Sequence, residues 1–483
     1  MRFAPLRSSR LPALLFTALF VLTASSCSGG GECCSPEERT AEVWLTIGNG
    51  SVRLEQQATR AFSAAADATN DLTITVDPTT TYQTMEGFGA ALTNSSAFLI
   101  HNHPQRQAIL ETLFSPTEGI DISYVRVPLG ASDFTAEPPR GYTYNDVAAG
   151  TSDPDLSAFS IAPAEAFILP VLRDALALNP DLRIMATPWS APGWMKTSDA
   201  LNGGQIRNDA LEPFAKYLIR ALEAYEAAGV PIAAVTLQNE PLHQASNYPT
   251  MGMTAAQQAT LIAEHFGPML AASSVDAEVL AYDHNWDRPD FPLAVLNNAA
   301  ANPFVDGVAW HCYAGDVSAQ SQVHNAHPDK GTYFTECSGG GWSTDYGNNL
   351  SWNMRNLFIG GTRNWAKAVL LWNLALDTQS GPFIGGCTNC RGVLTLSDDG
   401  FTREVEYESI GHFTRFVQPG AVRLSTTQAA DLLAVAFRNP DGTIVLVAHN
   451  TSGSGVAFDV QVGEEVLAYS MPAGSLATLR WDG

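Results

Sequence analysis

Basic residues are scarce in this chain. Its 483 residues include 26 lysines and arginines against 49 aspartates and glutamates, and the formal net charge is −23. Binding to nucleic-acid phosphates requires a positive field, so nonspecific nucleic-acid binding is excluded. Electrostatic docking on an anionic lipid surface is disfavoured for the same reason. A neutral substrate such as a carbohydrate is compatible with this charge, and no sequence feature indicates a protein partner.

Long hydrophobic runs are absent beyond the N-terminus, where residues 11–24 read LPALLFTALFVLTA. That run follows three arginines and is short for a membrane helix, which needs about 20 apolar residues, so residues 1–26 are predicted to be a signal peptide. Cys27 follows small residues, as the lipidated cysteine of a bacterial lipoprotein does. The alternative is an ordinary secretory signal cut near Ser25. We expect a cell-surface or outer-membrane lipoprotein, otherwise a periplasmic or secreted protein.

The seven cysteines lack the partners that a zinc site requires. The sequence has one Cys-X-X-Cys pair, Cys387 and Cys390, with no second pair and no histidine pair to complete a tetrahedral site. In an oxidising compartment these two cysteines can instead bridge and stiffen their loop. Cys312 and Cys337 each follow a polar residue, and both free thiols and a bridge are compatible with the sequence. No metal site is predicted.

Strand patterns occupy the two ends of the chain. Residues 27–40 are rich in serine and glycine and are predicted to be a flexible tether. Alternating apolar and polar residues then predict strands in 41–80 and again in 404–483, with turn signals such as NPDG between several of them. Both sets are most economically combined in one β-sandwich built from the two ends.

The middle of the chain, residues 81–403, alternates short apolar runs with longer helical patterns such as LEPFAKYLIRALEAYEAAG. Eight runs are candidate strands: GFGAAL, ISYVRVPL, LRIMATPW, IAAVTLQN, EVLAYDHN, VDGVAWHCY, GTYFTECS and AVLLWNLAL. Eight strands alternating with helices over about 300 residues predict a (β/α)₈ TIM barrel.

Two of these runs end in a glutamate. VTLQNEPLH delivers Asn239 and Glu240 to the tip of the fourth strand, and the proline after Glu240 ends the strand ladder. Glu336 ends the seventh strand. Cleavage of a glycosidic bond needs one carboxyl group to protonate the leaving oxygen and one to stabilise or attack the anomeric carbon. The alternatives are that Asn239 and Glu240 cap the next helix and that Glu336 forms an ion pair with Arg126.

Other strand ends carry aromatic and hydrogen-bonding side chains. They are Arg126, Asp133, Trp189, His311, Tyr313, Trp372 and Asn373. Aromatic rings suit the apolar faces of sugars, and amides and carboxylates suit sugar hydroxyls. In a barrel all these groups would meet at the carboxyl ends of the strands. Arg126 is therefore predicted to support a carbohydrate site, and the other six residues are predicted to bind the substrate.

The chain resembles glycoside hydrolase family 30, which contains lysosomal-type glucosylceramidases and microbial β-1,6-glucanases. The matching motifs span about residues 80–425: MEGFGAALTNSSA, VRVPLGASDF, TPWSAPGWMKT, LNGGQIR, TLQNEP, YDHNW, GVAWHCY, TECSGG, LWNLALD and IGHFTRFVQPGAVRL. The resemblance implies retaining hydrolysis of a β-glucosidic bond with no metal or organic cofactor.

The resemblance also implies roles for individual residues. Glu240 would be the general acid/base and Glu336 the nucleophile, while Asn239 would contact the sugar 2-hydroxyl. Three residues would hold the terminal glucose: Asp133, Trp189 and Trp372. From chemistry alone, a neighbouring anion that raises the pKa of Glu240 would help it act as an acid. Arg126, His311 or Tyr313 would keep Glu336 ionised.

Several alternatives stay open within this interpretation. β-Xylosidase or β-fucosidase activity is compatible with the same motifs, as is a noncatalytic carbohydrate-binding surface lipoprotein on the same barrel. The presence of both glutamates favours the enzyme. The substrate is expected to be a carbohydrate or a glycolipid, and the motifs distinguish neither endo from exo action nor one oligomeric state from another.

Overall fold

The computed structural model describes residues 39–136 and 141–483. The predicted signal peptide, the lipidated Cys27 and nearly all of the predicted tether at 27–40 lie outside these residues. Thr40 already belongs to the first strand, β1 (Thr40–Ile47). In the part of the chain that is described, no helix combines the length and apolar character needed to cross a membrane.

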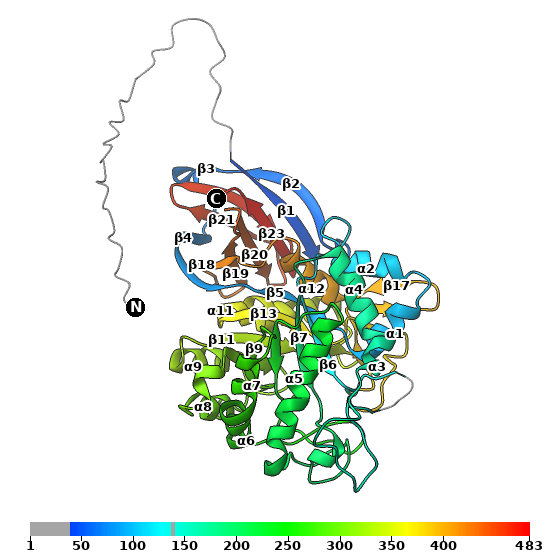
Figure 1. The fold of residues 1–483 in the computed structure, drawn as a ribbon. Coiled ribbons are helices and arrows are strands. Elements are labelled where there is room, and N and C mark those ends of the chain that lie inside the picture. The colour runs from blue at the N-terminus through cyan, green and yellow to red at the C-terminus, as the bar shows by residue number, and fades with distance from the viewer. Residues whose placement is uncertain (1–38, 137–140) are drawn as a thin grey trace, which may run out of the picture. The chain divides into compact units, whose positions relative to one another are not determined.

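A closed barrel of eight parallel strands forms the centre of the described chain (Figure 1). Its strands are β5 (Gly87–Ala91), β6 (Tyr124–Leu129), β7 (Arg183–Pro188), β8 (Ala234–Thr236), β9 (Glu278–Asn285), β10 (Gly307–His311), β11 (Gly331–Glu336) and β13 (Ala366–Leu371). Neighbours pair in chain order, and β13 closes the ring against β5. Each strand coincides with one of the eight predicted apolar runs, so the predicted TIM barrel is confirmed.

Helices surround the barrel because each buries one apolar stripe. In α5 (Leu211–Ala227), Phe214, Leu218, Leu222 and Tyr225 recur at helical spacing and are buried. The other main helices are α1 (Asn94–Asn102), α2 (Arg106–Phe114), α4 (Ile168–Leu178), α6 (Ala255–Thr260), α7 (Gly267–Ala272), α8 (Asp290–Leu296), α9 (Ser318–Ala326), α10 (Tyr346–Trp352) and α11 (Ile359–Arg363).

The β-sandwich combines strands from both ends of the chain, as predicted. Figure 1 shows the blue N-terminal and red C-terminal strands together, and β1 pairs with β23 (Ser475–Trp481). The other strands are β2 (Glu55–Ala61), β3 (Ser63–Ala64), β4 (Thr73–Thr84), β18 (Val422–Thr426), β19 (Leu432–Arg438), β20 (Ile444–Asn450), β21 (Val456–Val462) and β22 (Glu465–Met471). β4 belongs to both layers, since it pairs with β18 on one side and β21 on the other.

The structure differs from the predicted boundary at residue 404. Residues Val405–Thr414 form a helix, α12, and the first sandwich strand after it begins at Val422. All ten residues of α12 are buried, because the helix packs against β5 of the barrel and also meets the sandwich. A helix buried on every side has no amphipathic stripe, so its sequence carries little periodic signal.

His412 joins this helix to the sandwich. Its ring nitrogens lie 2.8 Å from the hydroxyls of Thr46, in β1, and Thr478, in β23. Thr478 donates its own proton to the His412 carbonyl, so its oxygen accepts from Nδ1–H. Burial lowers the pKa of His412 to about 3.

This burial predicts acid-sensitive folding. The unfolded chain protonates His412 near pH 6.5 while the folded chain does not, so the free energy of unfolding should decrease as the pH falls from about 6.5 towards 3. The decrease attributable to this group approaches about 1.4 kcal/mol per pH unit. We expect a His412→Gln variant to lose less stability across this range than the parent in urea titrations at several pH values. Parallel curves would contradict the assignment.

Candidate active site

Glu240 is held at the carboxyl end of β8 by its neighbours on both sides. The Asn239 amide donates to the carbonyl of Pro188, the last residue of β7, and the Glu240 amide donates to the Asp283 carbonyl, in β9. Glu240 has φ of 45°, a left-handed conformation that is costly for a residue with a Cβ. The next helix, α6, is capped by Thr254 instead. Asn239 and Glu240 therefore do not serve as a helix cap.

Glu336, at the end of β11, is oriented by two donors. Arg126 Nη1 donates to its Oε2 at 2.5 Å, and the Tyr313 hydroxyl donates to its Oε1 at 2.9 Å. Arg126 comes from β6 and is fully buried. The ion pair that the sequence offered as an alternative role for Glu336 is thus present, and it fixes the position of this carboxyl group at the cavity.

Arg126 also binds Asp283, which the sequence analysis did not single out. Its Nη2 donates to Asp283 Oδ2 at 2.9 Å and to Asn239 Oδ1 at 2.7 Å. Burial disfavours the ionised form of Asp283, but Arg126 and His311 outweigh it and hold the pKa of Asp283 well below its usual range. The sequence signal for this residue is its place in the YDHNW motif, as an acidic side chain after the apolar residues of β9.

His311 links Asp283 to Glu240. Its Nε2 lies 3.0 Å from Asp283 Oδ1 and its Nδ1 lies 3.1 Å from Glu240 Oε1. Burial opposes charging of the ring, but Glu336, Asp283 and Glu240 reverse that effect and raise the pKa of His311 to about 9. At neutral pH the ring is an imidazolium that donates to both carboxylates.

The same contact shifts the pKa of Glu240 in the direction opposite to that expected from the sequence. Burial alone would raise it, but the hydrogen bond and charge of His311 lower it, with smaller contributions from His284 and His243. Glu336, the neighbouring anion expected from the sequence, is present, but the His311 imidazolium is hydrogen-bonded directly to Glu240. The Glu240–His311 pair therefore holds one proton, which lies on the histidine ring at neutral pH.

The two glutamates lie close enough for double displacement. One oxygen of Glu240, one oxygen of Glu336 and one ring nitrogen of His311 all lie within 4.8 Å of one another. Retaining glycosidases place their carboxyl groups about 5–5.5 Å apart, and inverting ones about 6.5–9.5 Å. Glu240, Glu336 and His311 already have hydrogen-bond or ion-pair partners among one another, Arg126 and Asp283. The expectation that the site uses no metal ion stays a prediction.

A cavity of about 430 Å³ opens above this pair. Among the predicted residues, its lining includes Asp133, Trp189, Asn239, Tyr313 and Trp372 with the two glutamates. The rings of Trp189 and Trp372 are stacked with centroids 5.3 Å apart and planes inclined by 26°. Burial, reinforced by the charge of Glu336, raises the pKa of Asp133 well above its usual range, so this carboxyl can donate a hydrogen bond to a sugar.

Three predicted residues do not line the cavity. His311 and Asn373 were predicted to bind substrate, but both side chains are fully buried beneath it. His311 contacts Glu240 and Asp283, while Asn373 accepts a hydrogen bond from Thr93. Arg126, predicted as a supporting residue, is confirmed in that position. Sequence placed these residues at strand ends but could not distinguish a side chain at the surface of the cavity from one a layer below.

Other lining residues were missed. They are His243, Tyr248, His284, Asn285, Trp342 and Gly386. His284 and Asn285 belong to the YDHNW motif, which was the available signal. Gly386 has φ of 65°, and a Cβ there would lie 2.3 Å from an Asp133 oxygen. Only glycine leaves room for that carboxyl group.

Two disulfides stabilise the rim. Cys312 and Cys337 are bonded, which decides the question left open by the sequence, and they tie the ends of β10 and β11 together immediately after His311 and Glu336. Cys387 and Cys390 are also bonded, as expected, and both line the cavity.

Comparison with known proteins agrees with this architecture. Residues 85–417 match the profile of the glycosyl hydrolase family 30 TIM-barrel domain, and residues 420–479 match that of the family 30 beta sandwich domain. An endo-1,6-beta-D-glucanase of Aspergillus fumigatus is 36% identical, covering 79% of this chain and 82% of its own length. The mouse lysosomal acid glucosylceramidase is 28% identical, covering 85% and 83%.

A solved structure, that of the endo-beta1,6-glucanase BT3312, superposes with a TM-score of 0.84 at 32% identity and covers 92% of this chain and 99% of its own. The two family profiles and the superposed structure together cover nearly all of the described residues. This chain belongs to glycosyl hydrolase family 30 and is a glycoside hydrolase.

Proposed function

We propose that this protein hydrolyses β-1,6-glucan by double displacement, with retention of configuration. The observation that carries the proposal is the pair of glutamate oxygens within 4.8 Å of each other at the floor of a cavity with two stacked tryptophans. A carboxyl separation of this size supports a retaining mechanism. The linkage is supported by similarity to endo-1,6-glucanases from two comparisons.

In the first step, Glu336 attacks the anomeric carbon while the leaving oxygen takes a proton from Glu240. Arg126 and Tyr313 each donate a hydrogen bond to Glu336 and so fix the orientation of its carboxyl group. The proton reaches Glu240 from the His311 imidazolium along their 3.1 Å hydrogen bond. In the second step Glu240 removes a proton from water, which displaces Glu336 and releases the sugar.

Four other groups would position the sugar in this cavity. Trp189 and Trp372 provide aromatic surface, Asp133 offers a hydrogen-bond donor, and Asn239 lies beside Glu240 where it can contact the 2-hydroxyl. Trp342 is 59% exposed at the cavity and can support a further sugar of a polymer. The predicted signal peptide and the lipid anchor at Cys27 would place the enzyme outside the cell, where such polymers occur.

Glucosylceramide hydrolysis is the second candidate. It is supported by the similarity to the mouse lysosomal acid glucosylceramidase. Tyr313 and Trp342, both exposed and both at the cavity, could also contact the apolar part of a glycolipid. The chemistry at Glu240 and Glu336 would be identical for both substrates.

The substrate is tested by incubating the chain from residue 27 onward with β-1,6-glucan and, separately, with glucosylceramide. We expect a ladder of gluco-oligosaccharides from the glucan, resolved by size, and none from the Glu336→Gln variant. Release of glucose from the ceramide alone would establish the second candidate and reject the first.

The two glutamates should respond differently to the leaving group. Glu336→Gln is expected to lose about 10⁴-fold or more in kcat on every β-glucoside, because no nucleophile is left. Glu240→Gln should lose about 10²–10⁴-fold on an alkyl glucoside but release an acidic phenol in a fast burst, since that leaving group needs no proton. Stopped-flow absorbance measures the burst, and equal losses on both substrates would reverse or reject the assignment.

The Glu240–His311 pair predicts the alkaline limit of activity. Because the pKa of His311 is about 9, the shared proton is present below that pH and is lost as the pH rises through it. We expect kcat/KM to decrease above about pH 9, and a His311→Asn variant to lose activity at lower pH because Glu240 must then retain the proton alone. An unchanged alkaline limb in the variant would show that His311 does not hold this proton.

A further inference from the structure

A second cavity lies at the opposite end of the barrel strands from the active site. It has a volume of about 360 Å³, within the range of ligand sites, and includes Gly331, the first residue of β11. Glu336 is the last residue of the same strand, so the two cavities are separated by roughly 17 Å of extended chain. The second cavity is lined by two large aromatic residues, Tyr82, from β4, and Trp365, just before β13. We propose that this cavity is an accessory binding site for a neutral glucan chain.

Trp365 adopts a conformation that its side chain makes costly. It follows Asn364, the C-cap of α11, and has φ of 76°. Glycine usually fills this left-handed position after a helix, because a bulky residue there is strained. Such strain persists where the surrounding structure enforces it and is concentrated at ligand sites. The strained residue here is one whose ring lines a cavity.

Both aromatic rings are held rigidly. The His324 ring stacks on Trp365 with centroids 3.8 Å apart, and the Arg423 guanidinium lies 3.8 Å from the centroid of Tyr82. Tyr82 and Trp365 meet edge to face, 5.6 Å apart. Tyr82 is nevertheless 37% exposed. Two fixed rings at an angle, partly open to solvent, provide apolar surface for sugar faces at little cost in side-chain entropy.

The charges around the cavity favour a neutral ligand. Lys367 forms an ion pair with Glu86, and Lys330 lies 3.4 Å from Asp329 and donates to the Asn302 carbonyl. Burial lowers the pKa of His324, so its ring is neutral near pH 7. The two lysines are therefore already compensated, and an anionic ligand would gain little from them. Sugar hydroxyls can use the polar groups without such competition.

The identity of the glucan as β-1,6-linked rests on the proposed function. A site remote from the catalytic glutamates would retain a polymer strand while another segment enters the active site. Its effect should therefore be seen with polymers and not with short substrates. The relevant quantity is the ratio of kcat/KM for β-1,6-glucan to that for an aryl β-glucoside.

Two variants test the site in the Glu336→Gln background, which allows binding without turnover. Trp365→Asn removes the indole but keeps a residue that tolerates positive φ, and Tyr82→Ala removes the other ring. In gels containing β-1,6-glucan, we expect each to bind about fivefold more weakly than its parent. In the active protein, the ratio for polymer over aryl glucoside should decrease by a similar factor.

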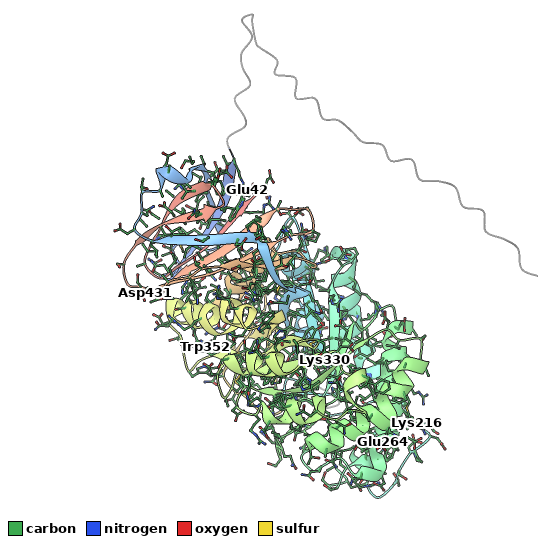
Figure 2. The ribbon with its side chains drawn as sticks, turned by 90° about the vertical axis from the view of Figure 1, so that its left-hand side faces the viewer. Glu42, Lys216, Glu264, Lys330, Trp352 and Asp431 are labelled. Atoms are coloured by element: carbon green, nitrogen blue, oxygen red, sulfur yellow. A yellow bond between two sulfur atoms is a disulfide. The ribbon has the colours of Figure 1, made fainter. Side chains whose placement is uncertain are left out.

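Trp352→Ala is the matched control, since Trp352 is 43% exposed and lines neither cavity. Figure 2 labels it at the end of α10, together with Lys330 of the second cavity. The control should bind as its parent does. Unchanged glucan binding by both cavity variants would overturn the proposal, and a lowered melting temperature of Trp365→Asn with unchanged binding would assign the ring to packing.

The failure of the proposed function would be distinguishable. If the wild-type protein leaves β-1,6-glucan intact but the cavity variants lose affinity for another neutral glucan in the gels, the substrate is wrong and the site stands. If β-1,6-glucan is hydrolysed and both variants bind as the parent does, the site alone is rejected. Binding of dextran sulfate that depends on Tyr82 and Trp365, with no neutral glucan bound, would also overturn it.

Discussion

The active site depends on one buried guanidinium. Arg126 is inaccessible to solvent and donates to Glu336, Asn239 and Asp283, which come from three different strand ends. A cation in this position would be very costly without its anions, and each anion would be costly without the cation. Burial disfavours its charge, but Asp283 and Glu336 raise the pKa of Arg126 above its ordinary value. The same group lies 4.8 Å from the Trp189 ring centroid, so it also supports the sugar-binding wall.

Asp283 extends this arrangement towards Glu240. It accepts from Arg126 on one oxygen and faces His311 on the other, and the hydroxyls of Thr236 and Thr335 complete its partners. His311 in turn holds Glu240. Glu336 and Glu240 are thus connected through one chain of buried charges, which explains why the pKa of Glu240 is lowered by a histidine instead of being raised by desolvation.

The rest of the molecule maintains the register of these strand ends. The Cys312–Cys337 disulfide joins β10 to β11 next to the reacting groups, and the glycine at position 386 leaves space for Asp133. On the other side, α12 packs on the first barrel strand and is bonded through His412 to both terminal strands of the sandwich. The sandwich therefore supports the barrel by buried hydrogen bonds and not only by apolar contact.

Sequence alone determined the barrel, the sandwich made from both chain ends, and the position of two glutamates at strand ends, because strand runs and strand-end polarity are local patterns. Tertiary structure decided what those patterns cannot encode. It buried His311 and Asn373 outside the lining of the cavity, brought Asp283 into contact with His311, and lowered the pKa of Glu240, since side-chain burial and charge proximity depend on neighbours distant in the chain. It also revealed the helix α12, which the sequence did not predict because burial on every side leaves no periodic pattern of apolar residues.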